Sequence, residues 1–307
     1  MSKGTITAIS TNTIQSKAED FPNILHHIPD PPARLYVQSN RWRELQGHPW
    51  VAIVGSRKPT AYGRSVTAQL AAALAQAGVV IVSGLAIGID GVAHRAALDA
   101  GGLTVAILAG GLDAIYPGRH QDLAKTILQQ GGALVSEYPD GTRHYPQHFI
   151  ARNRLVSGLS QAIAITEAAE KSGTLHTARF GLEQGKDVFA VPGNITSPLS
   201  IATNRLIKSG AYPLTSSRDI LQHLGLEAAP RSRPQGATPA EQALLDLLYA
   251  GESVGSILLA KSGLAVSAFN QALTMLEITG KIRALGADRW SIVEYQPRPT
   301  DVMGNIG

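Results

Sequence analysis

Short apolar runs that recur from residue 50 onward constrain the fold more than any other feature of this sequence. The runs lie at 50–54, 79–82, 103–108, 133–135, 161–165 and 187–191. Segments with helical periodicity stand between several of them, at 65–77, 91–100 and 121–130. Strands that are apolar along their whole length are typical of parallel sheets covered by helices on both faces. The pattern predicts a doubly wound, Rossmann-like α/β domain over 50–228.

The segments outside this domain differ from it in amino-acid composition and in the pattern of their apolar residues. Residues 1–49 are interpreted as a polar tail followed by an irregular lead-in with a proline cluster. Residues 229–239 are rich in Pro, Gly and Arg and predict a linker. Over 240–294, three helical stretches precede two short strand-like runs around Gly286, which predicts a C-terminal winged-helix domain. Residues 295–307 are interpreted as a loose tail.

Composition excludes several classes of protein. Hydrophobic residues make up 44% of the chain, so a sizeable core is expected rather than wholesale disorder. There is no cysteine, which excludes disulfides, thiolate metal sites and thiol redox chemistry and is consistent with a cytoplasmic location. Residues 65–89 carry no charge, but their polar residues and glycines favour a soluble helix, a turn at Ala77 and Gly78, and a buried strand. We therefore expect no membrane insertion.

Charge is distributed unevenly between the two predicted domains. Residues 141–210 hold eight basic and four acidic side chains, a net charge of +4. Residues 236–295 hold four basic and six acidic side chains, a net charge of −2. Phosphate neutralisation supplies most non-specific affinity for duplex DNA, so a winged helix that grips a duplex should be basic. The distribution favours anion binding by the α/β domain and a protein-contacting or weakly binding role for the C-terminal one.

Glycine-bearing loops follow four of the predicted strands. They cover 55–63, 83–90, 109–113 and 167–174. In an open parallel sheet such loops meet helix N-termini, whose free N–H groups and dipoles suit phosphate. Neither G-x-G-x-x-G nor the P-loop pattern is present, so a dinucleotide dehydrogenase or P-loop ATPase is poorly supported. The glycines could simply permit tight turns; basic residues in two of these loops instead favour a phosphate polymer.

A second informative cluster surrounds Phe149. Arg152 and Arg154 follow it at short spacing and offer guanidinium forks for phosphate, while Phe149 offers a face on which a base can stack. The alternative is an amphipathic helix with Phe149 in the core and the arginines on a solvated face. Both interpretations remain open on spacing alone.

Candidate catalytic and metal groups are weak. Asp90 and His94 stand at helical spacing, but a cap residue and a structural histidine explain such a pair more simply than acid–base catalysis. His144 and His148 lie in a segment interpreted as a loop, with no third ligand evident nearby. We expect no catalytic residue, no metal and no cofactor.

Several motifs in order resemble the DprA/Smf DNA-processing family. They are VAIVGSR (51–57), SGLAIGIDGVAHRAAL (83–98), AILAGGLDAIYP (106–117), SEYP (136–139), FIARNRLVSGLS (149–160), EAAEKSGTLHTA (167–178), VFAVPGNI (188–195) and NRLIKSGA (204–211). The resemblance covers about residues 21–225. The sequence departs from the family pattern at 118–120 and at Ala202, and the helical module common before the lead-in is not evident.

The resemblance implies a non-catalytic, cytoplasmic protein that binds single-stranded DNA. Such proteins protect incoming strands in natural transformation, help to load the recombinase RecA, and often act as homodimers. Together with the glycine loops, the matching positions predict the nucleic-acid-binding residues Gly55, Ser56, Arg57, Gly84, Gly88, Phe149, Arg152, Asn153, Arg154, Lys171, Ser172, Gly173 and Thr174.

Two alternative functions stay open at this stage. The first is a nucleotide phosphoribohydrolase, because the LOG family has a related fold and a P-G-G-x-G-T-x-x-E motif. Thr177 occupies the position of its catalytic carboxylate, and a threonine cannot act as a base at neutral pH. The second is a duplex-DNA regulator that acts through the winged helix, which the net charge of −2 disfavours.

Overall fold

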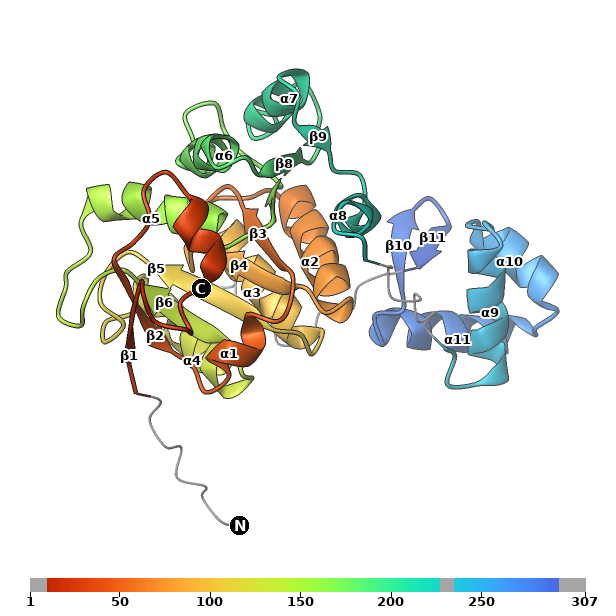
Figure 1. Cartoon of the computed structure of the whole chain (residues 1–307). Coiled ribbons are helices and arrows are strands. Elements are labelled where there is room, and N and C mark those ends of the chain that lie inside the picture. Colours follow the sequence, from red (N-terminus) through yellow and green to blue (C-terminus); the bar gives the residue numbers. More distant parts are fainter. Residues whose placement is uncertain (1–9, 227–234, 293–307) are drawn as a thin grey trace, which may run out of the picture. The chain divides into compact units, whose positions relative to one another are not determined.

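The computed structural model describes residues 10–226 and 235–292. The chain divides into two compact units, Met1–Ala229 and Pro230–Gly307. The first unit is built on a nine-stranded sheet with the order β1-β2-β6-β5-β4-β3-β7-β8-β9 (Figure 1). The second unit contains a two-stranded sheet and helices of its own.

Six parallel strands form the centre of the large sheet, and all six are the predicted apolar runs. They are β3 (Trp50–Val54), β4 (Val80–Ser83), β5 (Thr104–Leu108), β6 (Ala133–Ser136), β7 (Ala162–Ile165) and β8 (Asp187–Ala190). Successive side chains of a strand point to opposite faces. In β5, for example, Val105 and Ile107 belong to one apolar cluster while Ala106 and Leu108 belong to another.

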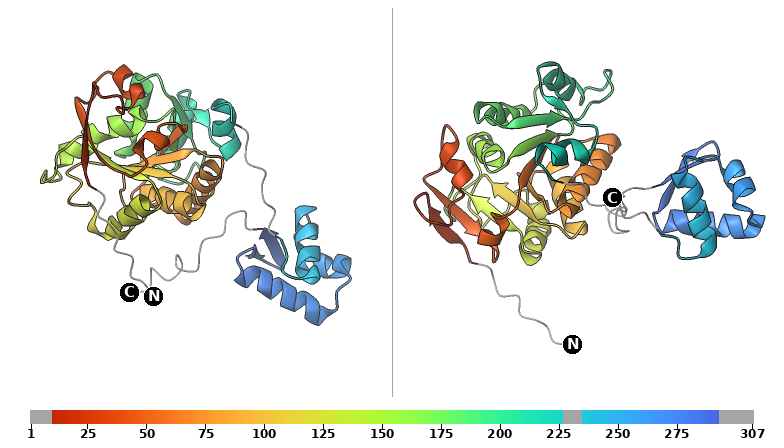
Figure 2. Two further views of the ribbon diagram at one scale, coloured as in Figure 1. Left: turned by 60° about the horizontal axis from the view of Figure 1, so that its bottom comes forward. Right: turned by 45° about the vertical axis from the view of Figure 1, so that its right-hand side comes forward.

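Helices cover both faces of this sheet, as predicted (Figures 1 and 2). One layer contains α2 (Ala61–Gln76), α3 (Ile89–Asp99) and α4 (Gln121–Gln129), with α8 (Ser217–His223) packed against α2. The opposite layer contains α5 (Pro146–Gly158) and α6 (Thr174–Glu183), which pack against each other. The short helix α7 (Ile201–Lys208) contacts β8. The domain is therefore doubly wound.

The prediction that residues 1–49 form a polar tail and an irregular lead-in was wrong in part, because both segments contribute a strand, and the sheet is mixed rather than wholly parallel. Strand β2 (Arg34–Gln38) pairs antiparallel with β6, and β1 (Asn12–Gln15) pairs antiparallel with β2 (Figure 2, red). The alternation in β2 explains this, because Leu35 and Val37 are buried in the core. A 3₁₀ helix (Asn23–His27) and α1 (Trp42–Leu45) complete the segment.

Strand β3 is the point at which the winding of the sheet reverses. The chain adds β4, β5 and β6 on one side of β3, then returns to add β7, β8 and β9 (Tyr212–Pro213) on the other. The loops at the carboxyl ends of β3 and β7 therefore lead to α2 and α6 on opposite faces of the sheet, and open α/β sheets bind ligands at such a switch point. This topology places the loops that begin at Gly55 and Thr166 side by side.

The uncharged stretch 65–89 is folded as expected, into a helix, a turn and a buried strand. It contains most of α2, a glycine with positive φ at Gly78, and β4. Over the described ranges 10–226 and 235–292, no helix combines the length and apolar character needed to cross a membrane.

The second unit contains the three helices and the hairpin predicted from its sequence. They are α9 (Pro239–Tyr249), α10 (Gly255–Ser262), α11 (Val266–Ile278), β10 (Ile282–Gly286) and β11 (Arg289–Ile292). Leu244, Leu258, Phe269 and Leu276 form its apolar centre. Helix α9 begins at the last residue of the predicted linker. Most of the rest of that linker, and the predicted tail 295–307, lie outside the described residues.

Candidate nucleic-acid interface

Three of the predicted glycine loops are joined by main-chain hydrogen bonds into one surface. The Ser56 N–H donates to the Glu167 carbonyl at 2.8 Å, which connects the loops after β3 and β7. The Ile89 N–H donates to the Ser56 carbonyl at 3.1 Å, which connects the loop after β3 to the start of α3. The Thr174 hydroxyl donates to the Gly55 carbonyl at 3.0 Å. The loops are therefore fixed relative to one another.

Glycine is required at two of these contacts. Gly88 has φ of 88°, and a Cβ there would lie 2.3 Å from the Ser56 carbonyl oxygen. A Cβ at Gly55 would lie 2.7 Å from Ile89 Cγ1 and 2.9 Å from the Glu167 carbonyl oxygen. Real Cβ atoms do not approach other atoms so closely, so these glycines permit the loops to pack together. This is the turn-forming role that the sequence left open, and it does not by itself show a ligand.

Glu167 braces the loop after β3, a role that the sequence did not indicate. Its side chain is 2% exposed, and its carboxylate accepts hydrogen bonds from both the N–H and the hydroxyl of Thr60. Thr60 is also the N-cap of α2 and accepts from the Gly63 N–H at 3.1 Å. A buried carboxylate satisfied in this way holds residues 55–60 in one conformation.

The outer side of this surface carries exposed cations. Arg57 and Lys58 are exposed in the loop after β3, and Lys171 is exposed in the loop after β7. Gly173, also exposed, is the N-cap of α6, whose first turn contributes the positive end of a helix dipole. Ser172 is half-buried and its hydroxyl bonds to Thr174, which is buried. The geometry suits phosphate oxygens at Arg57 and at the start of α6.

Phe149 lies between the core and the solvent, next to the exposed arginine. It is half-buried in the first turns of α5, and the Arg57 guanidinium carbon is 5.8 Å from its ring centroid. That distance is within the range of a cation–π contact. The Tyr116 ring stands 5.5 Å away at an interplanar angle of 64°. Arg57, from the loop after β3, and Phe149, from α5, thus come together although they are about 90 residues apart in sequence.

Arg152 is not available to phosphate in the way the sequence suggested. It is 5% exposed, and its guanidinium donates to the carbonyls of Gly84 and Ile107. The Asp90 carboxylate accepts from the N–H groups of Gly84 and Ala86 and attracts the same guanidinium charge. Burial lowers the pKa of Arg152 to about 10, against the opposing effect of Asp90. Arg152 therefore ties α5 to the loop after β4.

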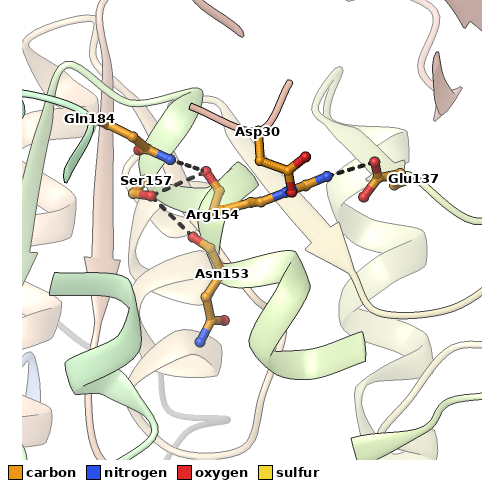
Figure 3. A network of polar contacts seen from close by, with 6 residues as sticks. All are labelled: Asp30, Glu137, Asn153, Arg154, Ser157 and Gln184. Carbon is orange, nitrogen blue, oxygen red and sulfur yellow. Dashed lines mark hydrogen bonds and ion pairs between the residues drawn. The ribbon is translucent and has the colours of Figure 1, made fainter. Parts of the chain in front are cut away.

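Arg154 is likewise directed into the protein. Its Nε lies 2.6 Å from a carboxylate oxygen of Asp30 and its second terminal nitrogen 2.7 Å from Glu137 (Figure 3). The side chain is only 9% exposed. Figure 3 also shows Gln184 donating to the main-chain carbonyl of Arg154. Its ion pairs connect α5 to Asp30 in the lead-in and to Glu137, directly after β6. The two carboxylates compensate the buried charge of the guanidinium.

Asn153 connects the two halves of the interface. Its side-chain amide donates to the Gly173 carbonyl at 3.4 Å, while its carbonyl oxygen accepts from Arg152 Nε at 3.3 Å. The side chain is half-buried. Of the predicted site residues, the structure therefore gathers Gly55, Arg57, Gly88, Phe149, Asn153, Lys171, Ser172 and Gly173 around one surface. Ser56, Gly84, Arg152, Arg154 and Thr174 lie buried behind it.

Asp90 and His94 do not form an acid–base pair. Asp90 is bound to main-chain N–H groups, and burial raises the pKa of its carboxyl. His94 is fully buried, and its Nδ1 lies 2.6 Å from the Thr104 hydroxyl. That hydroxyl donates to the Ile81 carbonyl, so His94 Nδ1 carries the proton and donates to it. Burial, followed by the charges of neighbouring His120, Arg95 and Arg152, lowers the pKa of His94 to about 3.

The two histidines near Phe149 belong to aromatic contacts. His148 lies in the first turn of α5, not in a loop as predicted, and stacks on Tyr138 at 4.1 Å between centroids. His144 packs against Tyr116 at 5.4 Å. Within the part of the chain that the structure describes, no group of three or more His, Cys, Asp or Glu side chains could hold a metal ion.

These features define the first unit as a Rossmann-like α/β domain with a rigid, cation-bearing loop surface at the switch point of its sheet. The family described as DNA recombination-mediator protein A matches residues 12–225. The chain belongs to this family.

Curated relatives and solved structures agree with that assignment. The chain is 45% identical over 213 residues to "Protein Smf" of Escherichia coli, covering 69% of this chain and 56% of the relative. It is 41% identical over 213 residues to "DNA processing protein DprA" of Bacillus subtilis, covering 69% of this chain and 71% of that relative. The match thus spans little more than half of the E. coli protein's length.

Two solved structures of family members resemble the fold. The DNA processing protein A from Streptococcus pneumoniae superposes with a TM-score of 0.65 and 37% identity, covering 69% of this chain and 74% of that one. The Helicobacter pylori protein superposes with a TM-score of 0.62 and 34% identity, covering 70% of this chain and 94% of that one. The H. pylori structure gives insight into a single-stranded DNA binding mode of that protein.

Proposed function

We propose that this protein binds single-stranded DNA along the carboxyl edge of its sheet and acts as a recombination mediator. The observation that carries the proposal is the exposed Arg57, which lies against the half-buried ring of Phe149 beside the loop that bears Lys171. A guanidinium next to an aromatic ring offers a phosphate contact and a base platform at adjacent positions. Duplex DNA keeps its bases stacked inside, so this combination suits an unpaired strand.

The family supports the biological part of the proposal. Membership in a recombination-mediator family, and relatives named for DNA processing, favour a role in handling DNA for recombination. We include in the proposal that the protein takes up incoming strands in natural transformation, assists loading of RecA, works as a homodimer and acts in the cytoplasm. The description of the family as recombination mediators favours the role beside RecA, and the absence of cysteine is consistent with the cytoplasm.

The proposed DNA contacts differ from the set predicted from sequence. Arg57, Lys171 and the main chain at Gly173 would bind phosphates, and Phe149 would stack on a base. Asn153 and Ser172 would contact the strand from the same surface. Arg152 and Arg154 would instead hold α5 and its Phe149 in position, since their guanidinium groups already bind carbonyl and carboxylate oxygens.

We propose a binding role without catalysis. Thr177 occupies the place of the phosphoribohydrolase carboxylate, lies in α6 and is 2% exposed. The nearby carboxylate of Glu167 accepts two hydrogen bonds from Thr60. Neither group is placed to remove a proton from a nucleotide, so the geometry favours a binder over that alternative.

The second unit fits a winged-helix domain, with three helices followed by a hairpin. Its proposed partner is a protein rather than duplex DNA. The net charge of −2 over 236–295 offers little neutralisation to phosphates. Several apolar side chains are also exposed on this unit, among them Val266 at 61% and Ile278 at 72%.

Replacing Arg57 with alanine tests the phosphate contact. Arg57→Ala should weaken binding of a fluorescein-labelled oligo-dT and reduce the slope of log affinity against log salt by about 0.7, the value for one phosphate contact on a single strand. Fluorescence anisotropy over a range of NaCl concentrations measures both quantities. Arg57→Lys should restore most of the slope, because the charge is retained.

Phe149→Ala is the matched control for this experiment. Loss of a stacking ring should weaken binding about tenfold and leave the salt slope unchanged, because stacking is not ionic. If the salt slope of Arg57→Ala equals that of the unmodified protein, Arg57 does not contact a phosphate. A Phe149→Ala protein that loses its native circular dichroism would show that the ring serves the core instead.

A further inference from the structure

The geometry points to Tyr116 as a second base-stacking ring, adjacent to Phe149, so that the interface would bind two unstacked bases of one DNA strand. This inference depends on the proposed single-stranded DNA binding and extends it to a residue outside the predicted site. Tyr116 lies in the loop after β5, on the β4 side of β3 in the sheet order. The strand would therefore continue from Phe149 toward the β5 and β6 end of the sheet.

The ring geometry favours two bases over one. The centroids of Tyr116 and Phe149 are 5.5 Å apart, and their planes meet at 64°. A planar base cannot stack on both rings at that angle, so each ring offers a separate platform. His144 packs against both rings, at 5.4 Å from Tyr116 and 6.2 Å from Phe149, and supports them from within the protein.

Tyr116 has a surface available for such a contact. Its side chain is 53% exposed. Phe149 already has the Arg57 guanidinium over its ring, whereas the cation–π contacts of the described residues do not involve Tyr116. Within the same residues, the Tyr116 hydroxyl takes part in no hydrogen bond with the protein. A broad aromatic face with a polar tip at the solvent boundary suits stacking on a base.

The loop that carries Tyr116 is held rigidly against its neighbour. The Leu112 N–H donates to the Asp140 carboxylate at 3.0 Å, and the Gly141 N–H donates to the Asp113 carboxylate at 2.9 Å. A third bond joins the Gly111 N–H to the Thr142 carbonyl at 3.1 Å. These reciprocal bonds position the ring before any ligand arrives, which lowers the entropic cost of binding.

The test compares three variants of the full chain on two labelled oligonucleotides. One probe is oligo-dT, and the other is an abasic oligonucleotide of equal length and charge. Tyr116→Ala should weaken oligo-dT binding about tenfold without changing the salt slope. Tyr116→Phe should stay within about twofold of the unmodified protein, since the ring is kept. On the abasic probe all of these proteins should bind alike.

Tyr212→Ala is the matched control. Tyr212 is 50% exposed and packs against Phe189 and His223 in a similar ring cluster, but on the edge strand β9. Its replacement should not change oligo-dT affinity. If Tyr116→Ala binds oligo-dT as tightly as the unmodified protein does, Tyr116 does not stack on a base, and the proposed function is unaffected. If the unmodified protein binds no oligonucleotide, both proposals fail.

Discussion

Replacing Arg152 with alanine should destabilise the first unit by about 3–5 kcal/mol, the largest effect we expect from a single substitution. The change removes the donor that satisfies the carbonyls of Gly84 and Ile107, both in the interior. It also leaves the buried Asp90 carboxylate without its compensating positive charge. Buried polar groups that lose a partner cost more than the original interaction contributes.

Tryptophan fluorescence can report this loss for the first unit alone. Trp42 and Trp50 are both buried there, while Trp290 belongs to the second unit. In a Trp290→Phe background, urea unfolding followed by fluorescence should show a lower midpoint for Arg152→Ala. Arg179→Ala is the control, because Arg179 is 61% exposed on α6 and its contacts, an ion pair with Glu183 and the Phe180 ring, lie at the surface of that same helix; its effect should stay below about 1 kcal/mol.

The same variant separates the two roles considered for Arg152. A residue that positions α5 should cost stability when removed, with a loss of DNA affinity that follows from the displaced Phe149. If Arg152→Ala keeps the stability of the parent protein but loses oligo-dT affinity together with salt slope, the guanidinium contacts phosphate. That result would contradict a structural role for the buried hydrogen bonds of Arg152 to the carbonyls of Gly84 and Ile107.

Acidification should destabilise the first unit through His94. The pKa of this imidazole is about 3 in the folded protein, against 6.5 as its ordinary value. Between these two values the unfolded chain binds a proton that the folded chain does not. The free energy of unfolding is therefore fully retained above about pH 6.5 and falls as the pH decreases toward 3, by at most about 1.4 kcal/mol per pH unit.

The pH profile of a His94→Gln variant measures this contribution. Urea unfolding in the Trp290→Phe background, repeated from pH 8 down to about pH 4.5, should give a flatter profile for the variant than for its parent. Above pH 7 the two profiles should run parallel, whatever constant difference in stability the substitution causes. Equal slopes at acid pH would mean that His94 is protonated as readily in the folded state as in the unfolded state.

The sequence predicted the central sheet well because its strands are buried on both faces. Runs such as 50–54 and 103–108 carry that signal locally. The lead-in lacks such a local signal, because β2 has only two buried positions, Leu35 and Val37, which alternate with polar residues and lie close to prolines. Its place in the sheet depends on pairing with β6, about 100 residues away, which no local pattern records.

The structure brings many of the predicted site residues to one surface, but several of their side chains point into the protein. The spacing of Arg152 and Arg154 suggested that both guanidinium groups bind phosphate. Their partners are instead Gly84 and Asp30, which lie 68 and 124 residues away along the chain. Such distant partners decide which side of α5 faces the core. Tyr116 could have been noticed, because an aromatic residue in a glycine-containing loop is unusual in a chain with 5% aromatic residues.

A titration of one labelled oligonucleotide, first single-stranded and then annealed to its complement, tests the central claim most directly. If the loops at the end of β3 and β7 bind phosphates while Phe149 stacks on an unpaired base, the single strand should bind at least about tenfold more tightly at physiological salt. Phe149→Ala should remove most of that preference. Equal affinity for the duplex, or no binding to either form, would contradict the account.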